Sequence, residues 1–176
     1  MNFIKDFRAL LIGLWLGAAI FFVAVAQSSF SVLPSRELAG SVVSRTLMIV
    51  NLSGLFIGLL LLVGSFIKQS GAKPFLLWTE RLVLALVIVS CAVGQFVIGS
   101  WLFYVRSQFG GKPIDEIAAD DPLKIQFNTL HEYSVWILFA GMVAALLAFF
   151  IILRKSDGNI KNITAGKTDE FKFDKF

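Results

Sequence analysis

Four long runs of apolar residues, separated by shorter polar segments, set the pattern of this chain. The runs cover residues 9–30, 46–67, 82–105 and 129–153, and apart from His131 and Glu132 they carry no ionisable acidic or basic side chain. As a helix, each run could cross the roughly 30 Å hydrocarbon layer of a membrane. Uninterrupted runs of this length favour helices over barrel strands, because they show no alternation of apolar and polar positions. The pattern predicts an all-α polytopic membrane protein whose four-helix transmembrane bundle occupies residues 1–153.

The polar segments between the runs differ in length. Residues 31–45 fit a turn followed by an interfacial helix, and residues 69–74 predict a tight turn. Residues 107–128 leave room for structure of their own, and we expect a short amphipathic helix at 114–119. The lysine-rich segment 154–176 is expected to be a mobile polar tail, because its glycines and asparagines should interrupt a helix.

The positive charges are distributed unevenly between the two sides of the predicted membrane domain. Eleven of the 16 lysines and arginines fall in the N-terminus, the second connection and the tail, and five fall in the first and third connections. Cytoplasmic segments carry the excess of Lys and Arg in membrane proteins. We therefore expect both termini to be cytoplasmic. Ala24-Val25-Ala26 resembles a signal-peptidase site, but the first run continues to Phe30 and reaches spanning length, so we expect it to remain as a helix.

The composition supports a membrane protein and argues against nucleic-acid binding. Hydrophobic residues make up 57% of the chain and charged residues 16%, and the mean hydropathy is +0.79. The sequence pI is about 9.4, yet the basic residues border the apolar runs and do not cluster with aromatic residues. The expected surroundings are therefore the lipid bilayer, with a membrane-protein partner or further copies of the chain.

Each predicted helix contains a pair of small residues spaced by four positions. Such pairs let helix backbones approach closely in lipid, where the hydrophobic effect does not drive helices together. The candidate packing residues are Gly13, Gly17, Gly54, Gly58, Ser90, Gly94, Gly141 and Ala145.

Polar side chains collect toward the predicted external half of the bundle. The candidates for a polar cluster are His131, Asn128, Asn51, Gln95, Gln27, Arg45 and Arg106. An amide in hydrocarbon is costly unless it is paired, so Asn51 and Gln95 should face the bundle. Two interpretations remain open: the groups satisfy one another and fix the helix register, or they form a site near His131 for a small ligand, a lipid or a partner protein.

Enzyme and metal chemistry find little support among the residues. No nucleophile-and-base motif or phosphate loop is present. A single cysteine, Cys91, and a single histidine give no intrachain disulfide and no zinc or copper set. Haem could take His131 as one ligand, but a bis-histidine site would need a second chain. We expect no catalytic residues, no metal and no cofactor.

Two groups of motifs resemble a known family. They are Gly13-Leu14-Trp15-Leu16-Gly17 with Pro34 and Ala39-Gly40 after it, and Phe127-Asn128-x-Leu130-His131-x-x-Ser134 at the head of the fourth run. The pattern is similar to the transmembrane protein 205-like family, also known as domain of unknown function 4149, over residues 7–153. The resemblance implies a four-helix integral membrane protein, bacterial and with no established activity. We therefore expect the protein in the bacterial cytoplasmic (inner) membrane.

Taken with the polar cluster, these features lead to three functional hypotheses. The first is a non-enzymatic bundle that binds a small ligand, lipid or partner protein at its external polar face around His131. The second is an accessory structural subunit of a larger membrane complex, respiratory or other. The third is a haem-binding or redox membrane protein.

Overall fold

The computed structural model describes residues 3–66 and 74–173, with side chains described as far as Arg154. Its elements are α1 (Phe3–Val32), α2 (Arg36–Gly64), α3 (Pro74–Ala92), the π-helix η1 (Val93–Ile98), α4 (Gly99–Ser107), the 3-10 turn η2 (Ile114–Glu116) and α5 (Pro122–Phe173). Four described segments are long and apolar enough to span a membrane: Phe3–Val32, Arg36–Gly64, Pro74–Ser107 and Pro122–Arg154. The prediction of an all-α bundle with four transmembrane helices is confirmed.

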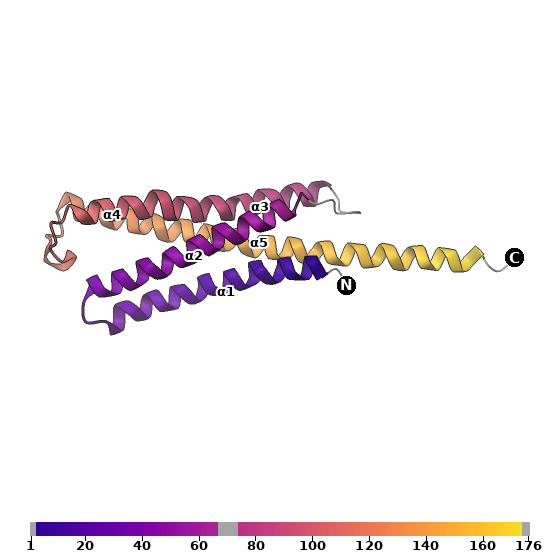
Figure 1. Ribbon diagram of the computed structural model, residues 1–176, viewed down its shortest axis with the longest axis horizontal. Helices are drawn as coiled ribbons and strands as arrows, with labels where there is room; N and C mark the ends of the chain where they lie inside the picture. The colour runs from indigo at the N-terminus through magenta and orange to yellow at the C-terminus, as the bar shows by residue number, and fades with distance from the viewer. Residues whose placement is uncertain (1–2, 67–73, 174–176) are drawn as a thin grey trace.

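The spans form a bundle in which each one contacts two neighbours. Helix α1 packs against α2 and α5, and α3 packs against the same two helices. The start of α1 and the far end of α5 lie at one end of the bundle, and the α1–α2 turn and the connection between α4 and α5 lie at the other (Figure 1). We call the second of these the loop end, and the first the terminal end. The turn predicted at 69–74 falls largely on residues outside the described part of the chain.

The helices begin earlier than the apolar runs that predicted them. Helix α2 starts at Arg36 because the Ser35 hydroxyl accepts a hydrogen bond from the Leu38 N–H at 3.2 Å, which caps the first turn. Helix α5 starts at Pro122, a residue suited to a first helical position, and the carboxylate of Asp121 accepts from the Leu123 N–H at 2.8 Å. The helices therefore continue beyond the apolar layer into polar sequence.

Two predicted irregular segments also differ from the structure. Residues 114–119 were expected to form an amphipathic helix, but only the single turn η2 forms there. The polar tail was expected to interrupt the helix, but α5 continues to Phe173. A glycine in a helix costs only about 1 kcal/mol relative to alanine, so the glycines of the tail do not by themselves end a helix.

The middle of the bundle is held together by close contacts at glycines. The indole Nε1–H of Trp15 donates to the Val50 carbonyl at 2.9 Å, and this approach is open because residue 54 is glycine. A Cβ at Gly54 would lie 2.7 Å from the Sγ of Cys91. At Gly58 a Cβ would lie 2.8 Å from a methylene carbon of Ile88. The side chain of Trp15 therefore extends from α1 into the middle of the bundle, where it packs against α2 beside Cys91 of α3.

The remaining candidate packing residues divide into two groups. A Cβ at Gly141 would lie 3.1 Å from the Cβ of Ser90, and Ala145 is fully buried, so α3 and α5 approach closely along this face. A Cβ at Gly13 would lie 3.3 Å from the Cε2 of Phe149 of α5. Gly17 is exposed, and a Cβ there would meet no atom within 4 Å. The small pair of α1 therefore lies at the edge of the bundle and not in its core.

An ion pair is buried at the terminal end. The Nη2 of Arg8 lies 2.5 Å from the Oε1 of Glu80, and the two side chains are 7% and 0% exposed. The same Nη2 donates to the Leu61 carbonyl at 2.9 Å. Arg81, next to Glu80, donates to the Ser65 carbonyl at 3.1 Å and lies over the Phe66 ring. The two arginines thus satisfy carbonyls in the last turn of α2, where cations are favoured.

This arrangement predicts that Glu80→Leu destabilises the bundle by about 3–5 kcal/mol, because the guanidinium of Arg8 would be left buried without its counterion. Unfolding in mixed detergent micelles would measure the loss. The double variant Arg8→Met with Glu80→Leu should recover most of the stability, since it removes both charges.

The control for the ion pair is Arg36→Gln. Arg36 and Asp115 form an exposed pair at 3.5 Å, and exposed pairs contribute at most about 1 kcal/mol. A double variant as unstable as Glu80→Leu alone would contradict the assignment of the loss to an unpaired charge.

The glycine contacts predict that Gly54→Ala destabilises the bundle by about 1–3 kcal/mol, the usual range for overpacking. The new methyl group would lie 2.5 Å from the Cε2 of Trp15, so the indole would have to leave its hydrogen bond. Thermal unfolding followed by tryptophan fluorescence would report both effects. The matched control, Gly17→Ala, should be neutral or slightly stabilising, and an equal loss at both positions would refute the packing argument.

Candidate functional site

Exposed aromatic side chains mark the depth of the loop end in the membrane. Trp101 and Tyr104 of α4 and Tyr133 and Trp136 of α5 are all exposed. Trp and Tyr concentrate at the level of the lipid headgroups, where an apolar ring and a polar atom can both be accommodated. The head of α5, which carries Asn128 and His131, therefore lies at the membrane–water boundary.

The connection between α4 and α5 folds into a small cap at this end. Gly110 and Gly111 have φ values of 62° and 82°, and such left-handed backbone at two successive residues favours glycine. Phe109 then turns inward and packs with Val105 and Leu130 in a second, small apolar cluster. The Nζ of Lys124 donates to the Ile117 carbonyl at 2.6 Å and closes the cap.

Two exposed ion pairs connect the cap and α4 to the start of α2. The Nη2 of Arg106 lies 2.8 Å from the Oε1 of Glu37, and Arg36 pairs with Asp115. Arg106 was a candidate cation for a ligand site. In the structure its charge is already paired by Glu37, which the sequence interpretation did not include.

The candidates on α5 lie on the outside of the bundle. The side chains of Asn128, His131 and Glu132 are exposed. Within the described residues, neither Asn128 nor His131 forms a hydrogen bond or ion pair. Leu130 and Ser134, in the same turns, are buried. The head of α5 thus presents an outward polar surface, and we call Asn128 and His131 the α5 polar strip.

The amide candidates on the other helices are placed differently. Asn51 is 4% exposed, and its Nδ2 would lie 3.3 Å from a Cβ on Gly94, so the amide packs directly on η1. Gln95, the next residue, is half-buried, whereas Gln27 and Arg45 are exposed. The structure therefore brings Asn51 to the segment that contains Gln95, and no hydrogen bond within the described residues connects these amides to His131.

The polar groups most strongly buried at the terminal end were missed by sequence reasoning. Arg8 and Glu80 flank the first and third apolar runs, and a charge at such a border is ordinarily explained by membrane topology. The signal in the sequence that could have predicted this ion pair is the position of Glu80. Only Arg81 separates Glu80 from the apolar run that begins at residue 82, so in a helix Glu80 lies within one turn of the hydrocarbon layer. A carboxylate at that depth is costly unless a cation pairs with it.

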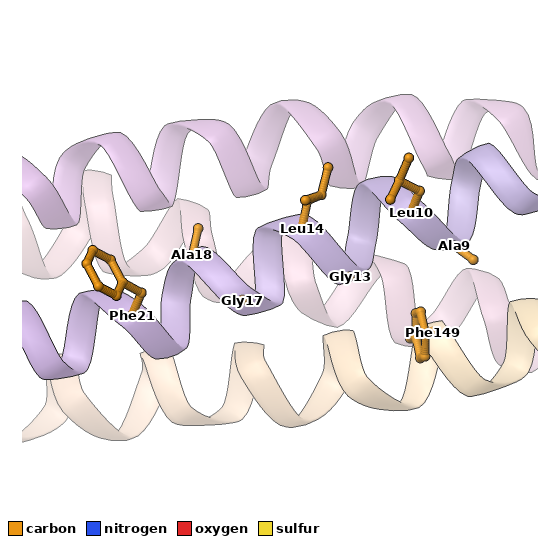
Figure 2. A pocket seen from close by; sticks show the side chains of 8 residues that line it. All are labelled: Ala9, Leu10, Gly13, Leu14, Gly17, Ala18, Phe21 and Phe149. Carbon is orange, nitrogen blue, oxygen red and sulfur yellow. The ribbon is translucent and has the colours of Figure 1, made fainter.

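The described cavities are open, apolar and away from the α5 polar strip. The larger, about 500 Å³, follows α1 from Ala9 to Phe21 beside Phe149 of α5 (Figure 2). The smaller, about 280 Å³, lies along α5 and ends at Arg154. In α5, position 149 is roughly 27 Å from position 131. Among the described residues no group of three or more His, Cys, Asp or Glu side chains could hold a metal ion.

Comparison with known proteins identifies a family. The family described as "Domain of unknown function (DUF4149)" matches residues 10–108, which is more than half of the chain and covers α1 from residue 10 onward together with α2, α3, η1 and α4. No curated protein and no solved structure matches. The match ends before α5, so the segment 127–134, on which the resemblance also drew, lies outside it. The chain is a multi-pass membrane protein that belongs to the DUF4149 family.

Proposed function

We propose that the protein is a non-catalytic membrane component that binds a partner membrane protein through the α5 polar strip. The observation that carries the proposal is the exposure of Asn128 and His131 at the membrane boundary, without any partner in the described part of the chain. Their amide and imidazole groups can donate and accept hydrogen bonds. Both properties suit contact with another molecule at that depth.

The shape of this surface favours a protein over a small molecule. Small-ligand sites are concave and bury most of their ligand, whereas the polar strip is on the convex outer side of a helix. The neighbouring Tyr133 and Trp136 are exposed, and aromatic residues are enriched in protein interfaces. The role that fits is an accessory subunit whose α5 packs beside a larger membrane protein.

An anionic phospholipid headgroup is the second candidate. Arg45 of α2 is exposed and forms no ion pair or hydrogen bond with another described residue. A guanidinium near the loop end of the bundle could attract a lipid phosphate. Haem could be held by His131 as its one protein ligand, whereas a bis-histidine site would need a second chain. The same purification that tests the partner tests for haem.

The orientation is part of the proposal. We place both termini on the cytoplasmic side of a bacterial inner membrane, with the loop end outside. The support is the excess of Lys and Arg in the segments at the terminal end. The α5 polar strip would then meet its partner at the external surface.

The double variant Asn128→Ala with His131→Ala should lose co-purifying partner protein without losing stability. Both side chains are exposed, and surface substitutions ordinarily change the free energy of unfolding by less than about 0.5 kcal/mol. The measurement is quantitative mass spectrometry of protein purified from native membranes, together with thermal unfolding.

The control is Gln126→Ala, which removes an exposed amide from a different face of α5. Equal recovery of every co-purifying protein from the wild type and the double variant would refute the partner role. If anionic phospholipid decreases instead, and decreases further in Arg45→Gln, the lipid function replaces it. A Soret band that is lost with His131→Ala would favour haem.

A cysteine at position 111 should react from outside the cell. In a Cys91→Ser background, Gly111→Cys places a thiol in the exposed loop at the loop end, and Pro74→Cys places one at the exposed start of α3 at the terminal end. A membrane-impermeant maleimide applied to intact cells should label the first and spare the second. Labelling of position 74 alone would reverse the proposed orientation.

A further inference from the structure

Two almost completely buried polar side chains belong to helices that contact the π-helix. Asn51 of α2 is 4% exposed and Ser134 of α5 is 8% exposed. Neither side chain forms a hydrogen bond with any residue of the described chain. An unpaired buried amide or hydroxyl costs about 1–3 kcal/mol, and a surrounding of lipid offers no partner to either group. Asn51 and Ser134 therefore need hydrogen-bond partners other than side chains and lipid.

Both side chains belong to helices that pack on η1. The Nδ2 of Asn51 would lie 3.3 Å from a Cβ on Gly94, so the amide packs against the backbone of η1, and α5 also contacts η1. Gly141 of α5 lies opposite Ser90 of α3. Helices α5 and α3 run in opposite directions, so moving along α5 from 141 to 134, roughly 10 Å, leads from the level of Ser90 to the level of η1.

The backbone of η1 adds polar groups that are not in regular α-helical pairing. The N–H of Gly99 donates to the Gly94 carbonyl, five residues back, where an α-helix would pair residues four apart. At the ends of such a segment the register changes, and backbone groups there lose or share their usual partners. A water molecule can insert into the hydrogen-bond ladder of a helix, and inserted water and π-bulges both accompany helix kinks.

We propose that η1, Asn51 and Ser134 form a hydration site inside the bundle, in which bound water completes the hydrogen bonds of both side chains. Neutral donors and acceptors surround the position and no acidic or basic side chain contacts it among the contacts described, which suits water better than an ion. The one fully enclosed side-chain nitrogen or oxygen without a partner, among described residues, is the Nε of Arg8. Asn51 and Ser134 thus retain a small accessible area through which water can reach them.

The depth of the site supports entry from the loop end. Gly94 is roughly 10 Å along the helix from Trp101, one of the exposed aromatic residues at the boundary. Toward the terminal end, Trp15 and Cys91 fill the space at Gly54. The hydration site is therefore bounded by a dry layer on one side and by the membrane surface on the other.

The test compares two glycines in the same protein, reconstituted in deuterated lipid. Solid-state NMR would measure magnetisation transfer from water to the backbone amides of Gly94 and Gly54 and to the side-chain amide of Asn51. We expect transfer to Gly94 and Asn51 to be several-fold faster than transfer to Gly54, which lies in the dry layer.

Two variants sharpen the test. Asn51→Leu should reduce the transfer at Gly94 to the level of Gly54, and Ser134→Ala, a smaller change that serves if Asn51→Leu does not fold, should reduce it several-fold. Gln27→Leu removes an exposed amide and should change nothing at Gly94. Transfer to Gly94 as slow as to Gly54 in the wild type, or transfer unchanged in Ser134→Ala, would overturn the proposal.

Discussion

A guanidinium and a carboxylate that are both withdrawn from water destabilise a protein strongly unless each one has the other within hydrogen-bond distance. Arg8 and Glu80 meet this condition at the terminal end, and they do so only when α1, α2 and α3 are all in place, because Arg8 also donates to the Leu61 carbonyl of α2. Displacing any of these helices would expose an unpaired charge or an unpaired carbonyl to lipid. The pair therefore fixes the axial position of three spans relative to one another.

Toward the middle of the bundle, the axial position of α1 relative to α2 is fixed by side-chain packing. Trp15 enters the bundle where Gly54 provides no side chain, and its indole satisfies the Val50 carbonyl while it borders Cys91. A translation of α1 by one turn would move Trp15 away from the space at Gly54 and from its acceptor, the Val50 carbonyl. The ion pair and the indole thus specify the same arrangement by independent means, one through charge and one through volume and a hydrogen bond.

Polarity at the loop end is divided between an outer surface and an inner position. Asn128 and His131 face outward at the level of the exposed Trp and Tyr residues, while Asn51 and Ser134 are buried and Asn51 packs against η1. On α5 the division is one of burial, since Asn128 and His131 are exposed whereas Leu130 and Ser134, in the same turns, are buried. An outer contact and an inner hydration site can therefore coexist in the same few turns without competing for the same side chains.

The number, type and approximate bounds of the spans were determined by the sequence, because twenty apolar residues without proline have one stable form in lipid, a helix with every backbone group paired internally. Close packing at Gly54, Gly58 and Gly141 was also anticipated by spacing. What spacing could not decide was which small residue faces a neighbour: Gly13 and Gly17 share a motif, yet Gly17 meets nothing within 4 Å. Only the tertiary structure pairs Arg8 with Glu80, binds Arg106 to Glu37 and turns His131 outward, because these depend on the rotation of whole helices about their axes. That rotation is set by packing between segments far apart in the chain, and local periodicity does not contain it.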